Sequence, residues 1–102
     1  MTLTKRAIIP EVYVLHQNYP YPFNPITTLK YDLPKYSHVT LTICDLNGRE
    51  INRLVSTNQS AGHKSIQWNA TDMHGKPVSA GVYIYQIRAG KFMQTKKMVL
   101  LK

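Results

Sequence analysis

Apolar and polar residues alternate with a period of two along most of the chain, and no segment keeps the helical spacing of apolar residues for three turns. Such alternation is typical of strands that bury one face and expose the other. The pattern predicts strands at approximately residues 12–17, 26–33, 38–45, 49–55, 62–69, 81–89 and 91–101. Seven short strands separated by turn signals favour an all-β fold, an antiparallel β-sandwich.

The alternation also predicts which side chains form the core. The only tryptophan, Trp68, is expected to point inward and to be the main core anchor. Two tyrosines, Tyr83 and Tyr85, share the inward face of one strand, so their hydroxyls need hydrogen-bond partners inside the fold. The other residues expected on inward faces are Leu29, Tyr31, Leu33, Val39, Leu41, Ile43, Ile66 and Ile87.

The predicted turns follow from local chemistry. Asn47-Gly48, between two strand patterns, is a strong hairpin signal because both residues tolerate a positive φ. Gly90 marks the turn between the last two strands, and residues 71–77 read as a loop. The stretch NYPYPFNP, at 18–25, holds three prolines. Their fixed φ angles limit the unfolded conformations of the crossing between the first two strands, which lowers the entropy lost on folding.

Size and charge restrict the classes of function. A chain of 102 residues fits one small domain with little room for an enclosed active site. The net charge of +8 attracts polyanions, but the basic residues are scattered and predict no specific nucleic-acid binding. No apolar run is long enough for a transmembrane segment. Residues 1–11 lack the apolar core of a secretory signal peptide and are expected to form an N-terminal linker or extension.

The reactive residue types form no catalytic or metal-binding pattern. Cys44 lies on the same strand face as Thr40 and Thr42, so it is expected to be a structural thiol that forms no internal disulfide. The four histidines form no HxH or HxxxH pair, and one carboxylate beside Asn69 and His74 is too few for a calcium site. No nucleophile with a base and no paired carboxylates are suggested. We therefore expect no cofactor, no metal and no enzyme activity.

Four ordered motifs carry a family resemblance over residues 15–102. They are QNYPYPFNPITTLKYDLP, VTLTICDLNGREINRLV, WNATDMHGKPVSAGVYIY and the closing QTKKMVLLK. Together they resemble the type A C-terminal sorting domain of type IX secretion substrates, a family similar to the immunoglobulin-like domain of the flagellar hook-capping protein. The resemblance implies a seven-stranded immunoglobulin-like sandwich over residues 12–102. The stretch SAGVYIY also resembles the tyrosine corner of such sandwiches, with Tyr83 as its tyrosine.

The resemblance also implies a function. Such domains end larger secreted bacterial proteins, which cross the periplasm and are exported by an outer-membrane translocon to the medium or the cell surface. In many substrates a sortase removes the domain and attaches the cargo to anionic lipopolysaccharide. One position departs from the family pattern, since Tyr21 replaces the first Asn of N-P-F-N-P. The recognition residues implied by position are Gly48, Arg49, Gly81, Tyr83, Lys96, Lys97 and Lys102.

Two functions from different classes follow. The first is a sorting and cell-surface anchoring signal, read through an exposed edge and the terminal KKMVLLK. The apolar MVLL is expected to leave two side chains on the outer face of its strand. The alternative is a carbohydrate-binding or spacer module of a polysaccharide-degrading enzyme. It would use exposed aromatic residues as a stacking platform, namely Tyr19, Tyr21, Phe23 and Tyr36.

Overall fold

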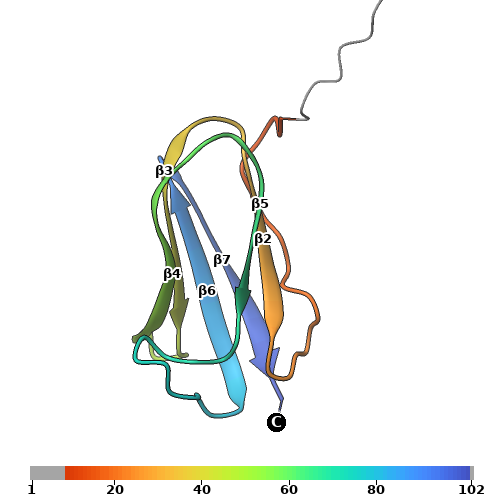
Figure 1. Ribbon diagram of the computed structural model, residues 1–102, viewed down its shortest axis with the longest axis vertical. Coiled ribbons are helices and arrows are strands. Elements are labelled where there is room, and N and C mark those ends of the chain that lie inside the picture. Colours follow the sequence, from red (N-terminus) through yellow and green to blue (C-terminus); the bar gives the residue numbers. More distant parts are fainter. Residues whose placement is uncertain (1–8, 102) are drawn as a thin grey trace, which may run out of the picture.

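The computed structural model describes residues 9–101, and within them it contains seven β-strands and no helix. Three strands form one sheet in the order β1-β2-β5, and four form the other in the order β4-β3-β6-β7. All strand pairs are antiparallel. The strands are β1 (Val14–Leu15), β2 (Thr27–Leu33), β3 (Ser37–Cys44), β4 (Glu50–Gln59), β5 (Gly62–Trp68), β6 (Gly81–Ala89) and β7 (Phe92–Leu100) (Figure 1).

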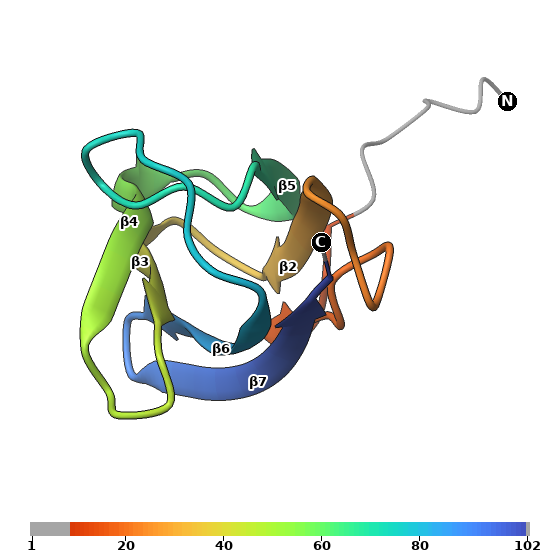
Figure 2. The ribbon, with the colours of Figure 1, turned by 90° about the horizontal axis from the view of Figure 1, so that it is seen from below.

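The two sheets face each other as an immunoglobulin-like β-sandwich, which confirms the predicted fold class (Figure 2). The core lies between them, and the strand faces agree with the alternation in the sequence: β2 and β3 bury every second residue. The side chains buried most completely, by volume, are Trp68, Tyr31, Tyr85, Phe23, Leu15, Leu29, Leu33, Leu41, Ile43, Ile87, Met98 and Leu100. No helix in residues 9–101 is long and apolar enough to cross a membrane.

Two strands differ from the prediction in length. β4 continues to Gln59, beyond the expected end at residue 55, because it pairs with β3 as far as Ser37. Its last residues, STNQ, are polar and show no alternation, so the sequence pattern gave no strand there. β1 is only two residues long, although backbone hydrogen bonds of His16 and Tyr19 keep the chain beside β2 as far as Tyr19.

The proline-rich segment makes the crossing between the first two strands and covers the open edge of β7. The backbone N–H of Phe23 donates to the carbonyl of Val99 at 3.0 Å, and Leu101 N–H donates to the carbonyl of Phe23 at 2.8 Å. Further up the edge, Gln17 Nε2 donates to the Lys97 carbonyl at 2.9 Å. An unpaired edge strand is open to pairing with other chains, so the crossing both joins the sheets and protects β7.

Asn18 holds the crossing in place from inside. Its Nδ2 donates to Thr27 Oγ1 at 2.9 Å and to the Pro20 carbonyl at 3.1 Å. Its backbone N–H donates to the Tyr85 hydroxyl, which in turn donates to the His16 carbonyl. Asn18 and Thr27 are both buried, and buried polar groups need such partners. The role of Asn18 was not predicted from the sequence, where an Asn two residues before a proline is only a turn signal.

Candidate recognition surface

Four of the implied recognition residues lie at one end of the sandwich. Gly48 and Arg49 follow β3, and Gly81 and Tyr83 begin β6. The register pairs Cys44 with Ile84 and Gly81 with Leu100, so the end of β3, the start of β6 and the end of β7 meet at this end. We call it the turn end; it is at the bottom of Figure 1. Lys96 and Lys97 lie in β7, and Lys102 falls outside the described residues.

The hairpin between β3 and β4 exists as predicted, but its turn differs. Gly48 has a φ of +84°, whereas Asn47 is not among the positive-φ residues of the described chain. The turn spans Asp45 to Gly48, with Gly48 N–H donating to the Asp45 carbonyl at 3.0 Å. The Asp45 carboxylate accepts from the backbone N–H groups of Asn47 and Arg49. These bonds hold the pKa of the Asp45 carboxyl below its ordinary value, and the bond from the Arg49 N–H has the largest effect.

The loop between β5 and β6 repeats this turn. Gly75 N–H donates to the Asp72 carbonyl at 3.0 Å, and Gly75 has a φ of +80°. The Asp72 carboxylate accepts from the backbone N–H groups of Lys76 and His74, which lower its pKa in the same way. DLNGR and DMHGK are therefore one structural motif used twice, with Asp first, Gly fourth and a basic residue fifth. This internal repeat was not predicted from the sequence, although both copies share the spacing of Asp, Gly and the basic residue.

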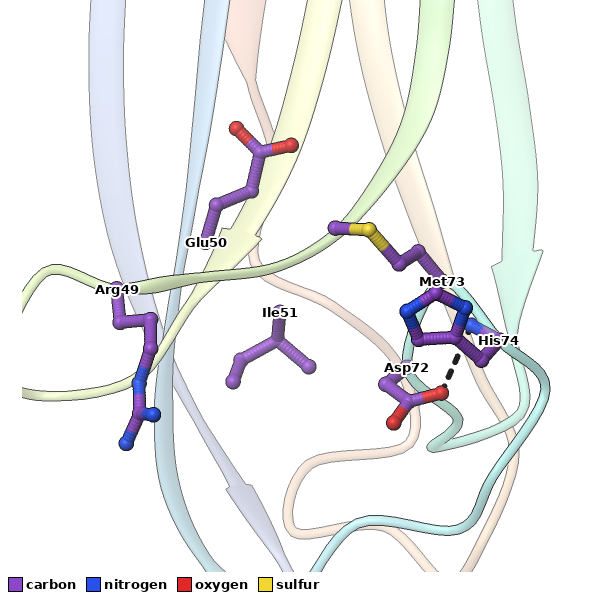
Figure 3. A pocket seen from close by; sticks show the side chains of 6 residues that line it. All are labelled: Arg49, Glu50, Ile51, Asp72, Met73 and His74. Carbon is purple, nitrogen blue, oxygen red and sulfur yellow. Dashed lines mark hydrogen bonds between the residues drawn. The ribbon is translucent and has the colours of Figure 1, made fainter.

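A pocket of about 320 Å³ lies between the two turns (Figure 3). Met73 N–H donates to the Ile51 carbonyl at 3.1 Å and so attaches the second turn to the start of β4. Both carboxylates of the pocket are bonded within the domain, Glu50 to Arg53 and Asp72 to backbone N–H groups. This arrangement suits contact with a partner better than acid–base chemistry. The lining residues are Arg49, Glu50, Ile51, Asp72, Met73 and His74.

Valine at Gly48 is expected to destabilise the domain by about 1–3 kcal/mol, and valine at Gly75 by a similar amount. A Cβ at either position meets no atom within 4 Å, so the cost is backbone strain at positive φ and not a clash. Urea unfolding of both variants measures it. Asn47→Ala, at a turn position without positive φ, is the control and should change stability by less than about 0.5 kcal/mol. Equal stability of Gly48→Val and the parent would contradict the assigned turn.

Tyr83 is buried and acts inside the fold. Its hydroxyl donates to the carbonyl of Ser79, four residues upstream, which is the bond of a tyrosine corner. Its ring packs edge-on against Trp68, with centroids 5.7 Å apart. This confirms the predicted need of the inward tyrosines for internal partners. A direct contact of Tyr83 with a recognition partner was implied by position alone and stays a prediction.

The two lysines of the terminal strand point to opposite faces. Lys96 shares the core-facing side of β7 with Met98 and Leu100, both of which are buried. Lys97 lies on the outer face, is exposed, and pairs across the sheet with Ile84. Lys96 and Lys97 therefore do not form one continuous basic cluster. Of the four apolar residues that follow Lys97, Val99 is half-buried and Leu101 is exposed, as the alternation predicts.

The prediction that four exposed aromatic residues form a stacking platform for carbohydrate is wrong. Phe23 is only 1% exposed, because it packs in the core against Trp68. Tyr36 is 68% exposed but lies in the turn between β2 and β3, at the end opposite Phe23 and Leu100. Only Tyr19 and Tyr21 remain exposed on the proline-rich segment. An irregular segment has no alternation, so the sequence could not tell its inward aromatic ring from its outward ones.

The residues considered for metal binding or nucleophilic chemistry have other roles. In the described part of the chain, no group of three or more His, Cys, Asp or Glu side chains could hold a metal ion. Asn69 Oδ1 accepts from the Thr71 hydroxyl at 2.6 Å. Burial, together with the negative charges of Glu50 and Asp45, raises the pKa of the Cys44 thiol. A raised pKa disfavours the reactive thiolate, in agreement with a structural thiol.

Two histidines share one carboxylate on the outer face of the three-stranded sheet. His63 Nδ1 lies 2.9 Å from Asp32 Oδ1, and His16 Nε2 lies 3.0 Å from Asp32 Oδ2. Partial burial would raise the pKa of Asp32, but the hydrogen bonds from His63 and His16 outweigh it and the pKa lies below its ordinary value. The cluster thus connects β2, β5 and the residue that follows β1 through the ionised form of Asp32.

Asp32→Asn is expected to remove a pH-dependent part of the stability. Because the folded pKa is lowered, the contribution of ionised Asp32 is complete above the unfolded pKa of about 4 and is lost as the pH falls through the folded pKa. Urea unfolding from pH 6 down to pH 3 should therefore show the stability gap between parent and variant closing. Glu11→Gln, at an exposed position, serves as the control. A gap that stays constant over this range would contradict the assignment.

Comparison with known proteins places the chain among immunoglobulin-like domains. The model of the FlgD Ig-like domain family matches residues 25–91, more than half of the chain. Among solved structures, PorU of Porphyromonas gingivalis, in its dimeric latent form, is similar at a TM-score of 0.67 and 20% identity, over 87% of this chain and 9% of that one. No relative among curated protein sequences matches the chain.

Two further structures share the fold. PorZ, a surface component of the type IX secretion system of P. gingivalis, is similar at a TM-score of 0.61 and 19% identity, over 86% of this chain and 11% of that one. FlgD of P. aeruginosa is similar at a TM-score of 0.58 and 21% identity, over 78% of this chain and 67% of that one. The chain thus spans only a small part of PorU and PorZ, and at these identities the likeness is one of fold.

Proposed function

Because the chain belongs to the family of FlgD Ig-like domains, we propose that it is a non-catalytic module that directs a larger bacterial protein through type IX secretion and to the cell surface. The observation that carries the proposal is the likeness in fold to PorZ, a surface component of that system. The four motifs of the sequence, up to the closing QTKKMVLLK, support the same function.

The proportions of the matches support a role as one module of a longer protein. Nearly all of this chain corresponds to 9% of PorU and 11% of PorZ. Four carboxylates of this small sandwich, those of Asp32, Asp45, Glu50 and Asp72, are bonded within the fold, which suits recognition by a partner better than catalysis. The proposed partners are an outer-membrane translocon and a sortase, with anionic lipopolysaccharide as the anchoring surface for a basic domain. The parent protein would then be secreted or held at the cell surface.

The test is a fusion of a reporter to this domain, expressed in a bacterium with the type IX system and in the same strain without its translocon. The reporter should reach the medium or the cell surface only in the first strain. The Ig-like domain of P. aeruginosa FlgD, fused in the same way, is the matched control, since it shares the fold but comes from a different protein. Export of both fusions alike, or of neither, would contradict sorting by this domain.

The family match also favours a second function, in assembly of the flagellar hook. FlgD of Xanthomonas campestris, a protein of hook capping in flagellar assembly, shares the fold. The similarity covers 89% of this chain at a TM-score of 0.58. The same fusions distinguish the two functions. A hook-capping domain gives no export that depends on the type IX translocon, whereas a sorting domain does.

A further inference from the structure

The outer face of the four-stranded sheet changes character along its length. Away from the turn end it is polar except for the exposed Met93: Thr40 pairs with Arg88, and Gln86 Nε2 donates to Thr95 Oγ1 at 3.2 Å. Toward the turn end it becomes aliphatic. Three β-branched residues lie side by side there on β6 and β7, and we call them the β6–β7 patch: Val82, Ile84 and Val99.

The β6–β7 patch lies on the solvent side of the sandwich. Its residues alternate with the buried Tyr83, Tyr85 and Met98, so they must point away from the core. Within the described residues, no strand or helix packs over this face (Figure 2). A solvated sheet face normally carries polar residues, and the other half of this one does with the exception of Met93. The three adjacent aliphatic residues of the patch are each half-buried by the domain itself, and a receptor surface could cover the part that remains exposed.

The rim of the β6–β7 patch carries a positive charge. Lys97 pairs across the sheet with Ile84 and is exposed. On the other side of Ile84, the register places Cys44 on β3, and Glu50 pairs with Cys44. Glu50 is bonded to Arg53 at 2.9 Å, and Asp45 is paired with Arg49. These nearby carboxylates are engaged elsewhere, and Lys97 makes no ion pair in residues 9–101.

We infer that the export machinery reads this domain through the β6–β7 patch and Lys97, by means of an apolar receptor surface bordered by carboxylates. The inference rests on the proposed function and names its contact face. An acidic rim on the receptor is complementary to Lys97 and to the net charge of +8, while the aliphatic centre supplies the area removed from water. The recognised feature is then a face that β6 and β7 build together, and not a linear terminal peptide.

The first test makes the patch polar while every replaced position keeps a β-branched side chain. Val82→Thr, Ile84→Thr and Val99→Thr keep β-branching, so the strands are retained while the face becomes polar. In the reporter fusion, the triple variant should reach the medium about tenfold less than the parent. Its thermal unfolding, measured in parallel, should remain cooperative. Export of a folded triple variant at the parent level would overturn the inference and leave the proposed function intact.

The second test is independent of the first. It compares Lys97, on the outer face of β7, with Lys96, on the inner face of the same strand. Lys97→Gln should reduce export about two- to fivefold, because it removes a rim charge. Lys96→Gln, on the inner side of the same strand, and Lys30→Gln, exposed on β2 of the other sheet, should leave export unchanged. Equal losses for all three variants would show a general charge effect and overturn the inference. Absence of export for the parent fusion would instead overturn the proposed function.

Discussion

Replacing Trp68 with alanine is expected to lower the free energy of unfolding by about 3–5 kcal/mol, a large part of the stability of a domain this size. Trp68 is 1% exposed and lies between two other rings, 5.9 Å from Phe23 and 5.7 Å from Tyr83, centroid to centroid. Its Nε1 donates to the Thr71 carbonyl at 2.9 Å. The substitution therefore opens a cavity and removes one of the two hydrogen bonds that the Thr71 carbonyl accepts, while the bond from Asn52 Nδ2 remains.

Urea unfolding followed by circular dichroism measures this loss, and two variants separate its parts. Trp68→Phe keeps an aromatic ring, but the ring is smaller and cannot donate to the Thr71 carbonyl, which retains its bond from Asn52 Nδ2, so the variant should cost about 1–3 kcal/mol. Tyr36→Ala, at an exposed turn position, should change stability by less than about 0.5 kcal/mol. An unchanged unfolding midpoint for Trp68→Ala would show that the tryptophan does not anchor the core.

A chain that ends at Thr95 is expected to be unfolded. Met98 and Leu100 are buried, and each contributes about 2–5 kcal/mol on the scale of large-to-alanine substitutions. The truncation also removes the β7 residues that pair with β6 from Gly81 to Tyr85, and the backbone bonds to Phe23. The combined loss is comparable with the whole stability of a small domain.

Near-ultraviolet circular dichroism and limited proteolysis distinguish the outcomes. A chain that ends at Leu100 keeps every paired residue of β7 and is the matched control, which should remain folded. A cooperative thermal transition in the chain that ends at Thr95 would contradict the role given to β7. Loss of export on such a truncation therefore reports loss of the fold, and recognition is better tested by the outer-face substitutions.

Local patterns in the sequence determined most of the fold. The side chains of a strand alternate between two faces, so Val39, Leu41 and Ile43 identified a buried face without knowledge of the partner strands. The hairpin after β3 was predicted for the same reason, since a turn of a few residues depends on its own residues. The error at Asn47 was local too: the pattern located the turn but not its type.

Contacts between distant residues decided the rest. Asn18 is essential to the crossing because it meets Thr27 and Tyr85, and no local pattern indicates a partner 67 residues away. The alternation in KKMVLL implies that Lys96 and Lys97 face opposite ways, but only the register with β6 shows that Lys97 lies beside Ile84. The sequence by itself therefore determined strands, faces and turns, which depend on neighbouring residues. The tertiary structure decided which faces meet and which remain open, because side chains from separate strands meet only when the chain is folded.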